Sequence, residues 1–391
     1  MTDNIFLMRI LHYLNYHSGG ITRYAAEVLR AMPADMENHV LCPPGTELTV
    51  PVCSIYPTLV DQRRGGGFNG RLKFLWSQIE NPFKMLQLLK HVRPDIVHFG
   101  NINHLSYQYW GPRLKALNIP FVVSVHDVRR EKPIINGRWE NKQLVSIYRA
   151  AAALLVHSNA QRDELAKFAG ISRDKIVIVP HGPYEYPIMK EPCDIRKELG
   201  IPREAKVGLL FGGIRDDKGV DLLISAVVEL PESHLIVAGR SASKLHKPVS
   251  FYRELAFRLG IESRIHFVDS YIPDETVADY FRAADWCGLV YHDSFSSQSG
   301  VLCSSVKYRT PLLVAGAPTL VETVQRFQIG VTAENRSAEA LSAAITRLCE
   351  LSKQENAFQF ERFEEECSWT RNAETTCETY RRITLCIIPK Y

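Results

Sequence analysis

Short apolar runs alternate along the chain with stretches that have helical spacing. In the first half, the helical stretch 22–32 places Tyr24, Val28 and Leu29 on one face. The apolar runs are flanked by polar or turn residues, as is typical of buried parallel strands whose two faces are covered by helices. Five strands are predicted here, over residues 5–11, 95–99, 121–125, 152–156 and 175–179.

The same alternation starts again after residue 185, with helical stretches that include 220–229 and 274–283. Two consecutive β/α series predict an α/β protein with two Rossmann-like, doubly wound parallel sheets. Residues 180–192 contain four prolines and are predicted to link the two domains. The cleft between the domains is then the expected site. The strands predicted in the second series are 207–211, 234–237, 265–268, 286–290 and 311–314.

Composition agrees with a folded protein and removes several other classes. The 391 residues are 46% apolar and 23% charged, which excludes disordered, collagen-like and small disulfide-rich proteins. A net charge of +4 gives no reason to expect a nucleic-acid partner. Nine scattered cysteines without a Cys-x-x-Cys pair favour reduced thiols. With no signal peptide and no apolar run of the ~20 residues that span a bilayer, a cytoplasmic location is expected.

One segment, residues 62–93, is unusually basic and rich in aromatic residues. It carries seven basic residues against the single acid Glu80, a net charge of +6. Such a segment could rest on anionic lipid, at the inner face of the cell membrane, or form an amphipathic layer with a solvated basic face. The sequence leaves both open. The apolar residues interleaved with the charges are Phe68, Leu72, Phe74, Leu75, Trp76, Phe83, Leu86 and Leu89.

Several common catalytic motifs are absent or lack their context. Gly65, Gly67 and Gly70 fit G-x-G-x-x-G, but no hydrophobic strand precedes them, and Arg71 and Leu72 replace the Lys-Ser/Thr pair of a P-loop. We therefore predict a flexible loop there. His-Glu-x-x-His, G-x-S-x-G and Asp-x-Asp do not occur. Zinc proteases, α/β-hydrolases and metal-dependent sugar transfer consequently lack support, and no metal is expected.

Two candidate site elements lie in the first series. Gly19 and Gly20 follow the first strand and open a helix, where backbone amides can approach an anion. His126 follows the strand 121–125 and could donate a hydrogen bond to a substrate oxygen or phosphate. The alternatives are a plain strand-to-helix turn and a structural histidine.

Two further elements lie in the second series. Gly213, Arg215 and Lys218 follow the strand 207–211, and two cations at a helix start can clamp a diphosphate. The alternative is a solvated turn in which Asp217 neutralises Lys218. Small residues at the start of a later helix can cradle phosphate, or act as an ordinary serine N-cap. These residues are Ser299, Gly300 and Val301.

These elements occur in an order that resembles glycosyltransferase family four, the retaining GT-B enzymes. The resemblance implies an acceptor-side domain over 1–183, a nucleotide-sugar domain over 184–366 and a helix over 367–391 that crosses back to the first domain. Its signature is carried by Gly19-Gly20, His126-Asp127, Val156-His157-Ser158, Val179-Pro180-His181-Gly182, Arg215 to Gly219, Val237-Ala238-Gly239, Ser299-Gly300, Thr310-Pro311 and Ser368-Trp369.

The resemblance also implies a reaction. A hexose would move from a UDP- or GDP-sugar, with retention and without metal or cofactor, to a glycan or lipid-linked acceptor, as in cell-surface polysaccharide or glycolipid synthesis. Arg215, Lys218 and His126 would be catalytic, Tyr271 and Ile272 would contact the base, and the acceptor would enter near Gly19-Gly20.

The chain departs from the family pattern at two carboxylates. The family has two glutamates, separated by seven residues, that hold the donor sugar and the ribose. Ser296 and Ser304 stand at those positions, and Asp293 is the nearest acid. This departure raises the alternative of a non-catalytic sugar-nucleotide-binding protein, and a nucleotide-sugar epimerase is a further alternative. The retained Arg215, Lys218 and His126 argue against the first.

Overall fold

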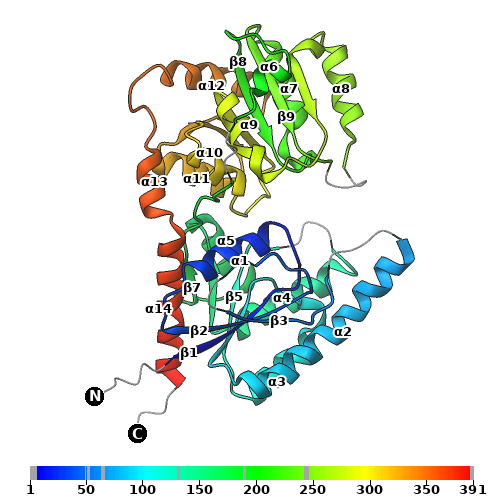
Figure 1. Cartoon of the computed structure of the whole chain (residues 1–391), viewed down its shortest axis with the longest axis vertical. Helices are drawn as coiled ribbons and strands as arrows, with labels where there is room; N and C mark the ends of the chain where they lie inside the picture. Colours follow the sequence, from blue (N-terminus) through cyan, green and yellow to red (C-terminus); the bar gives the residue numbers. More distant parts are fainter. Residues whose placement is uncertain are drawn as a thin grey trace. The chain divides into compact units, whose positions relative to one another are not determined.

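The computed structural model describes residues 7–48, 50, 53–62, 67–129, 133–187, 191–241 and 246–387 (Figure 1). The chain divides into two compact units. Unit 1 comprises Met1–His181 and Trp369–Tyr391, and unit 2 comprises Gly182–Ser368. Each observed boundary lies two residues from the predicted one.

Unit 1 contains a seven-stranded parallel sheet in the order β3-β2-β1-β4-β5-β6-β7. The order reverses between β1 and β4, and in open α/β sheets ligands bind outside the strand ends at such a point. The strands are β1 (Met8–Tyr13), β2 (Met36–Cys42), β3 (Cys53–Pro57), β4 (Ile96–Phe99), β5 (Phe121–Ser124), β6 (Ala153–Val156) and β7 (Ile176–Ile178).

Helices cover both faces of this sheet, because alternate strand residues point to opposite sides. Leu11 and Val97 belong to the core that also contains Met85 and Trp110 of the covering helices. Neighbouring strand residues belong to a second core, which α14 completes (Figure 1, red). The helices are α1 (Gly20–Arg30), α2 (Gly67–Val92), η1 (His104–Ser106), α3 (Tyr107–Ala116), α4 (Gly137–Ala150), α5 (Asn159–Ala169), η2 (Arg173–Lys175) and α14 (Trp369–Ile387).

Unit 2 repeats the plan with a six-stranded parallel sheet in the order β10-β9-β8-β11-β12-β13. Here the order reverses between β8 and β11. The strands are β8 (Lys206–Phe211), β9 (Ser233–Ala238), β10 (Ile265–Val268), β11 (Trp286–Tyr291), β12 (Leu312–Gly316) and β13 (Gly330–Thr332).

The helices of unit 2 pack on both sheet faces, over two separate apolar cores. They are α6 (Ile195–Glu198), η3 (Asp216–Lys218), α7 (Val220–Val228), α8 (Val249–Arg258), η4 (Glu262–Arg264), η5 (Asp274–Thr276), α9 (Val277–Ala283), α10 (Gly300–Lys307), α11 (Pro318–Phe327), α12 (Ala338–Leu351) and α13 (Phe360–Glu366). Within the described ranges, every helix is too short or too polar to span a bilayer.

The predicted two-domain, doubly wound fold is confirmed, and a strand lies at each predicted position. Strands β2, β3 and β13 were not predicted. The flexible loop expected at Gly65–Gly70 is wrong where it is described, because α2 begins at Gly67; Gly65 lies outside the described residues. A glycine inside a helix costs only about 1 kcal/mol. The buried face of a 26-residue helix outweighs that cost.

Buried histidines surround the contact between the unit 1 sheet and α14. The Tyr380 hydroxyl lies 2.5 Å from His98 Nδ1, and His12 Nε2 lies 2.9 Å from Asn38 Oδ1. Burial lowers the pKa of His12 and of His157 to about 4, from a usual 6.5. Both rings are therefore neutral at pH 7 in the folded chain.

These histidines predict an acid-sensitive unit 1. Between pH 6.5 and 4 the unfolded chain binds protons on His12 and His157 that the folded chain excludes, so stability decreases as the pH decreases. At pH 5 each should cost about 2 kcal/mol of the free energy of unfolding. Thermal unfolding measured from pH 7.5 to 5 should show a falling midpoint, with a shallower slope in His157→Gln. The variant of the exposed His91, His91→Gln, is the control; an unchanged slope in His157→Gln would contradict this account.

Candidate active site

The two cations predicted for the site, Arg215 and Lys218, lie on the loop after β8, beside the point where the strand order reverses. The chain passes through Gly212, with φ of 84°, and returns through Gly219, with φ of 63°, into α7. A Cβ atom on Gly219 would lie 2.6 Å from the Val290 carbonyl oxygen. Glycine is required there, because the loop packs directly against β11.

Lys218 is the buried cation of this loop. Its side chain is 8% exposed, and Nζ donates a hydrogen bond of 2.9 Å to the Phe211 carbonyl. The ammonium also lies 5.9 Å from the centre of the Tyr291 ring. Burial, reinforced by the positive charge of Arg215, lowers the pKa of Lys218 to about 8. The group is thus a largely desolvated cation at pH 7.

Arg215 and Asp217 form an ion pair next to Lys218. Arg215 Nη2 lies 2.9 Å from Asp217 Oδ2, with the guanidinium side chain 35% exposed. The ion pair of Asp217 is thus with Arg215, while its negative charge still partly offsets the effect of burial on the pKa of Lys218. Neither Arg215 Nε nor Asp217 Oδ2 has a well-aligned hydrogen bond among the described residues.

The first turn of α10 lies beside Lys218. A Cβ atom on Gly212 would be 3.4 Å from Lys218 Nζ and 3.8 Å from Val301 Cγ2. Ser299 precedes the helix, but its hydroxyl does not cap the helix and instead lies 3.4 Å from the Tyr291 hydroxyl. The first amides of a helix have no acceptor within the helix and favour anions. Two cations and a helix N-terminus therefore converge where a diphosphate could bind.

The other predicted donor residues of unit 2 are spread around this centre. Asp293 follows β11 and is exposed, and its Oδ1 would be 2.9 Å from a Cβ on Gly316. Ser304 is buried and donates a 3.0 Å hydrogen bond to the Gly300 carbonyl, so its hydroxyl is used inside α10. The Ser296 carbonyl accepts a hydrogen bond from the Thr319 hydroxyl.

Two predicted base contacts and Gly213 complete this set. Tyr271 is 71% exposed, whereas Ile272 is buried in a core of unit 2. Both follow β10, two strands from β8 in the sheet. Gly213 is exposed on the loop between β8 and Arg215.

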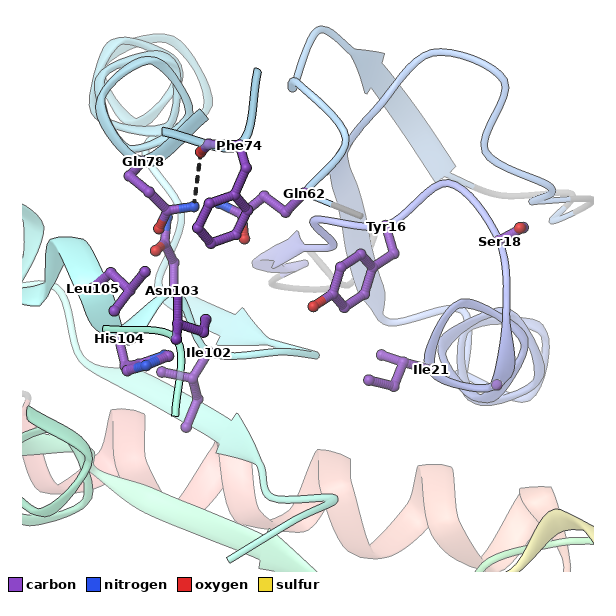
Figure 2. Close-up of a pocket in the computed structure, with 12 residues that line it drawn as sticks. Tyr16, Ser18, Ile21, Gln62, Phe74, Gln78, Ile102, Asn103, His104 and Leu105 are labelled. Carbon is purple, nitrogen blue, oxygen red and sulfur yellow. Dashed lines mark hydrogen bonds between the residues drawn. The ribbon is translucent and has the colours of Figure 1, made fainter. Parts of the chain in front are cut away.

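Unit 1 contains a cavity of about 510 Å³ where its own strand order reverses (Figure 2). The loops after β1 and β4 supply most of its lining, together with α2. Gly20 lines it, and Gly19, with φ of 106°, precedes α1 with open space on its Cα. The lining residues are Tyr16, Ser18, Gly20, Ile21, Gln62, Phe74, Gln78, Ile102, Asn103, His104, Leu105 and Ile134.

Two buried amides give this cavity its polarity. Gln62 is 6% exposed; its Oε1 accepts a 2.6 Å hydrogen bond from Asn15, while Nε2 has no partner among the described residues. Asn103 is 3% exposed, and neither atom of its amide makes a well-formed hydrogen bond to a described residue. Figure 2 shows Gln62, Phe74 and Asn103 on one side of the cavity and Tyr16 and Ile21 on the other. Buried amides beside apolar walls suit a ligand that carries hydroxyl groups.

A buried carboxylate holds one wall of the cavity in place. Glu140 Oε2 lies 3.0 Å from His104 Nε2, and Oε1 accepts 2.6 Å hydrogen bonds from the amides of Ile134 and Ile135. Burial by itself raises the pKa of Glu140, but these hydrogen bonds outweigh it and lower the pKa. The charged carboxylate therefore fixes His104 and Ile134, which both line the cavity.

His126 lies in an aromatic cluster of unit 1. Its ring centre is 4.9 Å from that of Tyr24, which also contacts Trp369 at 5.4 Å. Burial and the neighbouring His157 lower the pKa of His126 to about 3, and Nε2 is buried without a partner among the described residues. A neutral imidazole can donate one hydrogen bond but cannot act as an acid at pH 7.

Several residues of these two sites were not predicted. In unit 2 this residue is Tyr291, and in unit 1 they are Gln62 and Asn103; the pairing of Asp217 with Arg215 was also not predicted. Asn103 follows β4, and its place after a buried strand is a signal that sequence reasoning could have used. Among the described residues, no group of three histidine, cysteine or acidic side chains could hold a metal ion.

Comparisons with known proteins match both units. Residues 18–183 match the model described as Glycosyltransferase Family 4, and residues 193–361 match Glycosyl transferases group 1. The D-inositol 3-phosphate glycosyltransferase of Rhodococcus jostii is 30% identical over 304 residues, which are 73% of this chain and 65% of that protein. This chain thus matches slightly less than two thirds of that relative's length. The relative of the same name from Streptomyces griseus is 25% identical over 85% of this chain and 77% of its own length.

Solved structures share the fold. The sucrose-phosphate synthase of Thermosynechococcus elongatus has a TM-score of 0.74 at 18% identity, over 97% of this chain and 100% of that one. Anabaena HepE, in complex with UDP and glucose, has a TM-score of 0.71 at 17% identity, over 96% and 99%. With both parallel sheets and both family models in chain order, this chain belongs to glycosyltransferase family 4 and has the two Rossmann-like domains of the GT-B fold.

Proposed function

We propose that this protein transfers a hexose from a UDP- or GDP-sugar to a hydroxyl of a glycan or lipid-linked acceptor, with retention and without a metal. The observation that carries the proposal is the buried Lys218 beside Arg215 and the start of α10. Family membership supports it. So do the glycosyltransferase names of its relatives and the complex of the structurally similar HepE with UDP-glucose.

The catalytic contribution of unit 2 is electrostatic. As the bond between the anomeric carbon and the diphosphate breaks, negative charge grows on the departing oxygen. Lys218 is already desolvated and held by the Phe211 carbonyl, so it needs little reorganisation to stabilise that charge. Arg215 and the amides at Ser299–Val301 add positive potential at the same place.

Because the two glutamates are missing, other residues must bind the donor sugar. The Ser304 hydroxyl is used inside α10, so we assign donor contacts to Asp293 and Ser296 after β11, and base contacts to Tyr271 and the backbone at Ile272. His126, as a neutral imidazole, would donate a hydrogen bond to an oxygen of the donor sugar.

The acceptor is assigned to the cavity of unit 1. Gln62 and Asn103 can each donate to and accept from hydroxyl groups, and Tyr16 and Phe74 provide faces for the C–H side of a sugar ring. The cavity adjoins Gly20, which agrees with the predicted entry of the acceptor near Gly19-Gly20.

A panel of UDP- and GDP-sugars, each with candidate acceptors, separates the three functions considered for this chain. A transferase releases nucleotide and produces a glycosylated acceptor, or slowly hydrolyses the donor when no acceptor is present. An epimerase leaves an isomerised donor. A non-catalytic protein binds a donor, as a thermal shift would show, and turns nothing over; either of the last two results would overturn the proposal.

Removal of either cation should depress turnover while the fold persists. Arg215→Ala and Lys218→Ala should each lower kcat by about 10²–10³, the usual effect of losing one preorganised group in an active site. Steady-state nucleotide release measures this effect. Arg203→Ala and Lys353→Ala remove exposed cations of the same unit and should be silent. Turnover like that of the wild type in both site variants would refute the clamp.

Loss of either cavity amide should weaken binding of the acceptor and leave the reaction of the donor unchanged. Gln62→Ala and Asn103→Ala should each raise the KM for the acceptor up to about tenfold, the effect of one hydrogen bond, without changing donor hydrolysis. Gln87→Ala, which removes an exposed amide of α2, is the matched control. If the KM for the acceptor stays constant in both cavity variants, the acceptor binds elsewhere.

A further inference from the structure

One face of α2 presents large apolar side chains to solvent. The spacing of three or four residues places them in a single stripe along the helix. We call this set the α2 stripe: Leu72, Leu75, Trp76, Ile79 and Phe83, with exposed fractions of 49, 54, 59, 66 and 49%. Scattered exposed apolar residues are normal in proteins, but a contiguous row of five marks an interaction surface.

The opposite face of α2 is firmly attached to unit 1, so the exposure of the stripe is not due to loose packing. Phe74, Met85 and Leu89 are buried, the last two in the main core of the unit. Asn81 is fully buried, and its side chain makes two 2.8 Å hydrogen bonds to the backbone of Val60. The helix is therefore fixed with the stripe facing outward.

Cations border the stripe. Exposed Arg71 and Lys73 lie on its two margins, and exposed Lys90 continues its face toward the C-terminal end of α2. The acid of this helix, Glu80, is paired with Lys84. These three cations have no ion pair within the part of the chain that the structure describes, so the apolar row and its border complement an anionic, apolar surface.

That charge pattern selects between two kinds of occupant. A second copy of the chain would bring Arg71, Lys73 and Lys90 against the same cations, since a twofold interface joins identical patches. An anionic bilayer offers both hydrocarbon for the apolar side chains and negative charge for the cations. Of the two expectations for residues 62–93, the exposed apolar row favours contact with lipid.

We propose that unit 1 docks on an anionic membrane surface through the α2 stripe. The side chains of the stripe insert between the lipid head groups. The lipid phosphates are contacted by Arg71, Lys73 and Lys90. The helix lies in the plane of the interface and does not cross the bilayer.

Docking of this kind also indicates the chemical class of the acceptor, an inference that rests on the proposed function. Phe74 and Gln78 of α2 line the cavity of unit 1, on the side of the helix away from the stripe. The cavity is then about one helix diameter, ~10 Å, from the bilayer. A sugar carried on a membrane lipid could reach it, so we infer a lipid-linked acceptor.

Vesicle flotation tests the docking. The full-length protein should float with phosphatidylcholine vesicles containing about 30 mol% phosphatidylglycerol and not with phosphatidylcholine alone. The double variant Trp76→Ser/Phe83→Ser should bind at least about tenfold more weakly. Phe257→Ser is the matched control, because Phe257, on α8 of unit 2, is an aromatic residue that is even more exposed, at 66%.

The cations are tested separately. Arg71→Gln/Lys73→Gln/Lys90→Gln should weaken binding to the anionic vesicles by about 100-fold, and added salt should weaken the wild type in the same direction. Lack of flotation by the wild type, or full binding by both multiple variants, would overturn the proposal. So would a wild-type dimer in sedimentation equilibrium that Trp76→Ser/Phe83→Ser converts to monomer, since the stripe would then be covered by a second copy.

Donor hydrolysis in detergent-free buffer distinguishes this proposal from the function on which the acceptor inference rests. The apolar double variant and the triple cation variant should both hydrolyse nucleotide sugar at the wild-type rate but lose transfer to lipid-linked acceptors in vesicles. A wild type that floats but turns over no nucleotide sugar leaves docking in place and defeats the function. Wild-type rates of transfer to a vesicle-borne acceptor by both of these variants would contradict the docking proposal but not the proposed function.

Discussion

The burial of the Lys218 ammonium is the constraint around which unit 2 is arranged. A desolvated cation is costly, and the depressed pKa of Lys218 measures that cost. The loop after β8 supports it with the Phe211 carbonyl and with the ring of Tyr291, while Gly219 lets the loop approach β11. The arrangement is useful if an anion binds, because a buried cation attracts phosphate more strongly than a hydrated one.

The two units use the same position in the fold for different chemistry. Each sheet reverses its strand order once, and each reversal is bordered by the loops after two neighbouring strands. In unit 2 these loops carry Arg215, Lys218 and the start of α10, which match a diphosphate. In unit 1 they carry Asn103 and aromatic or apolar side chains, which match a hydroxylated and uncharged group. On the proposed function, donor binding in unit 2 and acceptor binding in unit 1 would follow from the side chains at these strand ends.

The sequence predicted the parts of the fold that depend on local pattern. Buried parallel strands are short apolar runs, so β4 to β12 were recognisable. Lys218 was recognisable because it lies on the loop that follows β8, at the start of the next helix. Strand β2 was missed because Asn38 and His39 interrupt its apolar run, although both side chains are buried. The start of α2 was wrongly predicted as a loop because glycines favour a loop locally. The buried face of the residues that follow stabilises the helix instead.

The cavity could not have been predicted in the same way. Gln62 and Asn103 are 41 residues apart and meet only when β3 and β4 take their places in one sheet. The partners of the charged groups were equally out of reach. Asp217 stands between Arg215 and Lys218 in the chain, and its pairing with Arg215 depends on the turn that buries Lys218. Pairings of this kind depend on the folded backbone and are not determined by the spacing of the residues in the sequence.

Calorimetric titration of UDP and GDP over about pH 7 to 9 tests the central role of Lys218 most directly. Because the pKa of Lys218 is about 8 in the free protein, affinity for the preferred nucleotide should decrease as the pH rises through that value. In Lys218→Met the affinity should be low and independent of pH over the same range. Wild-type affinity in Lys218→Met, or a wild-type affinity that does not change with pH, would contradict the account.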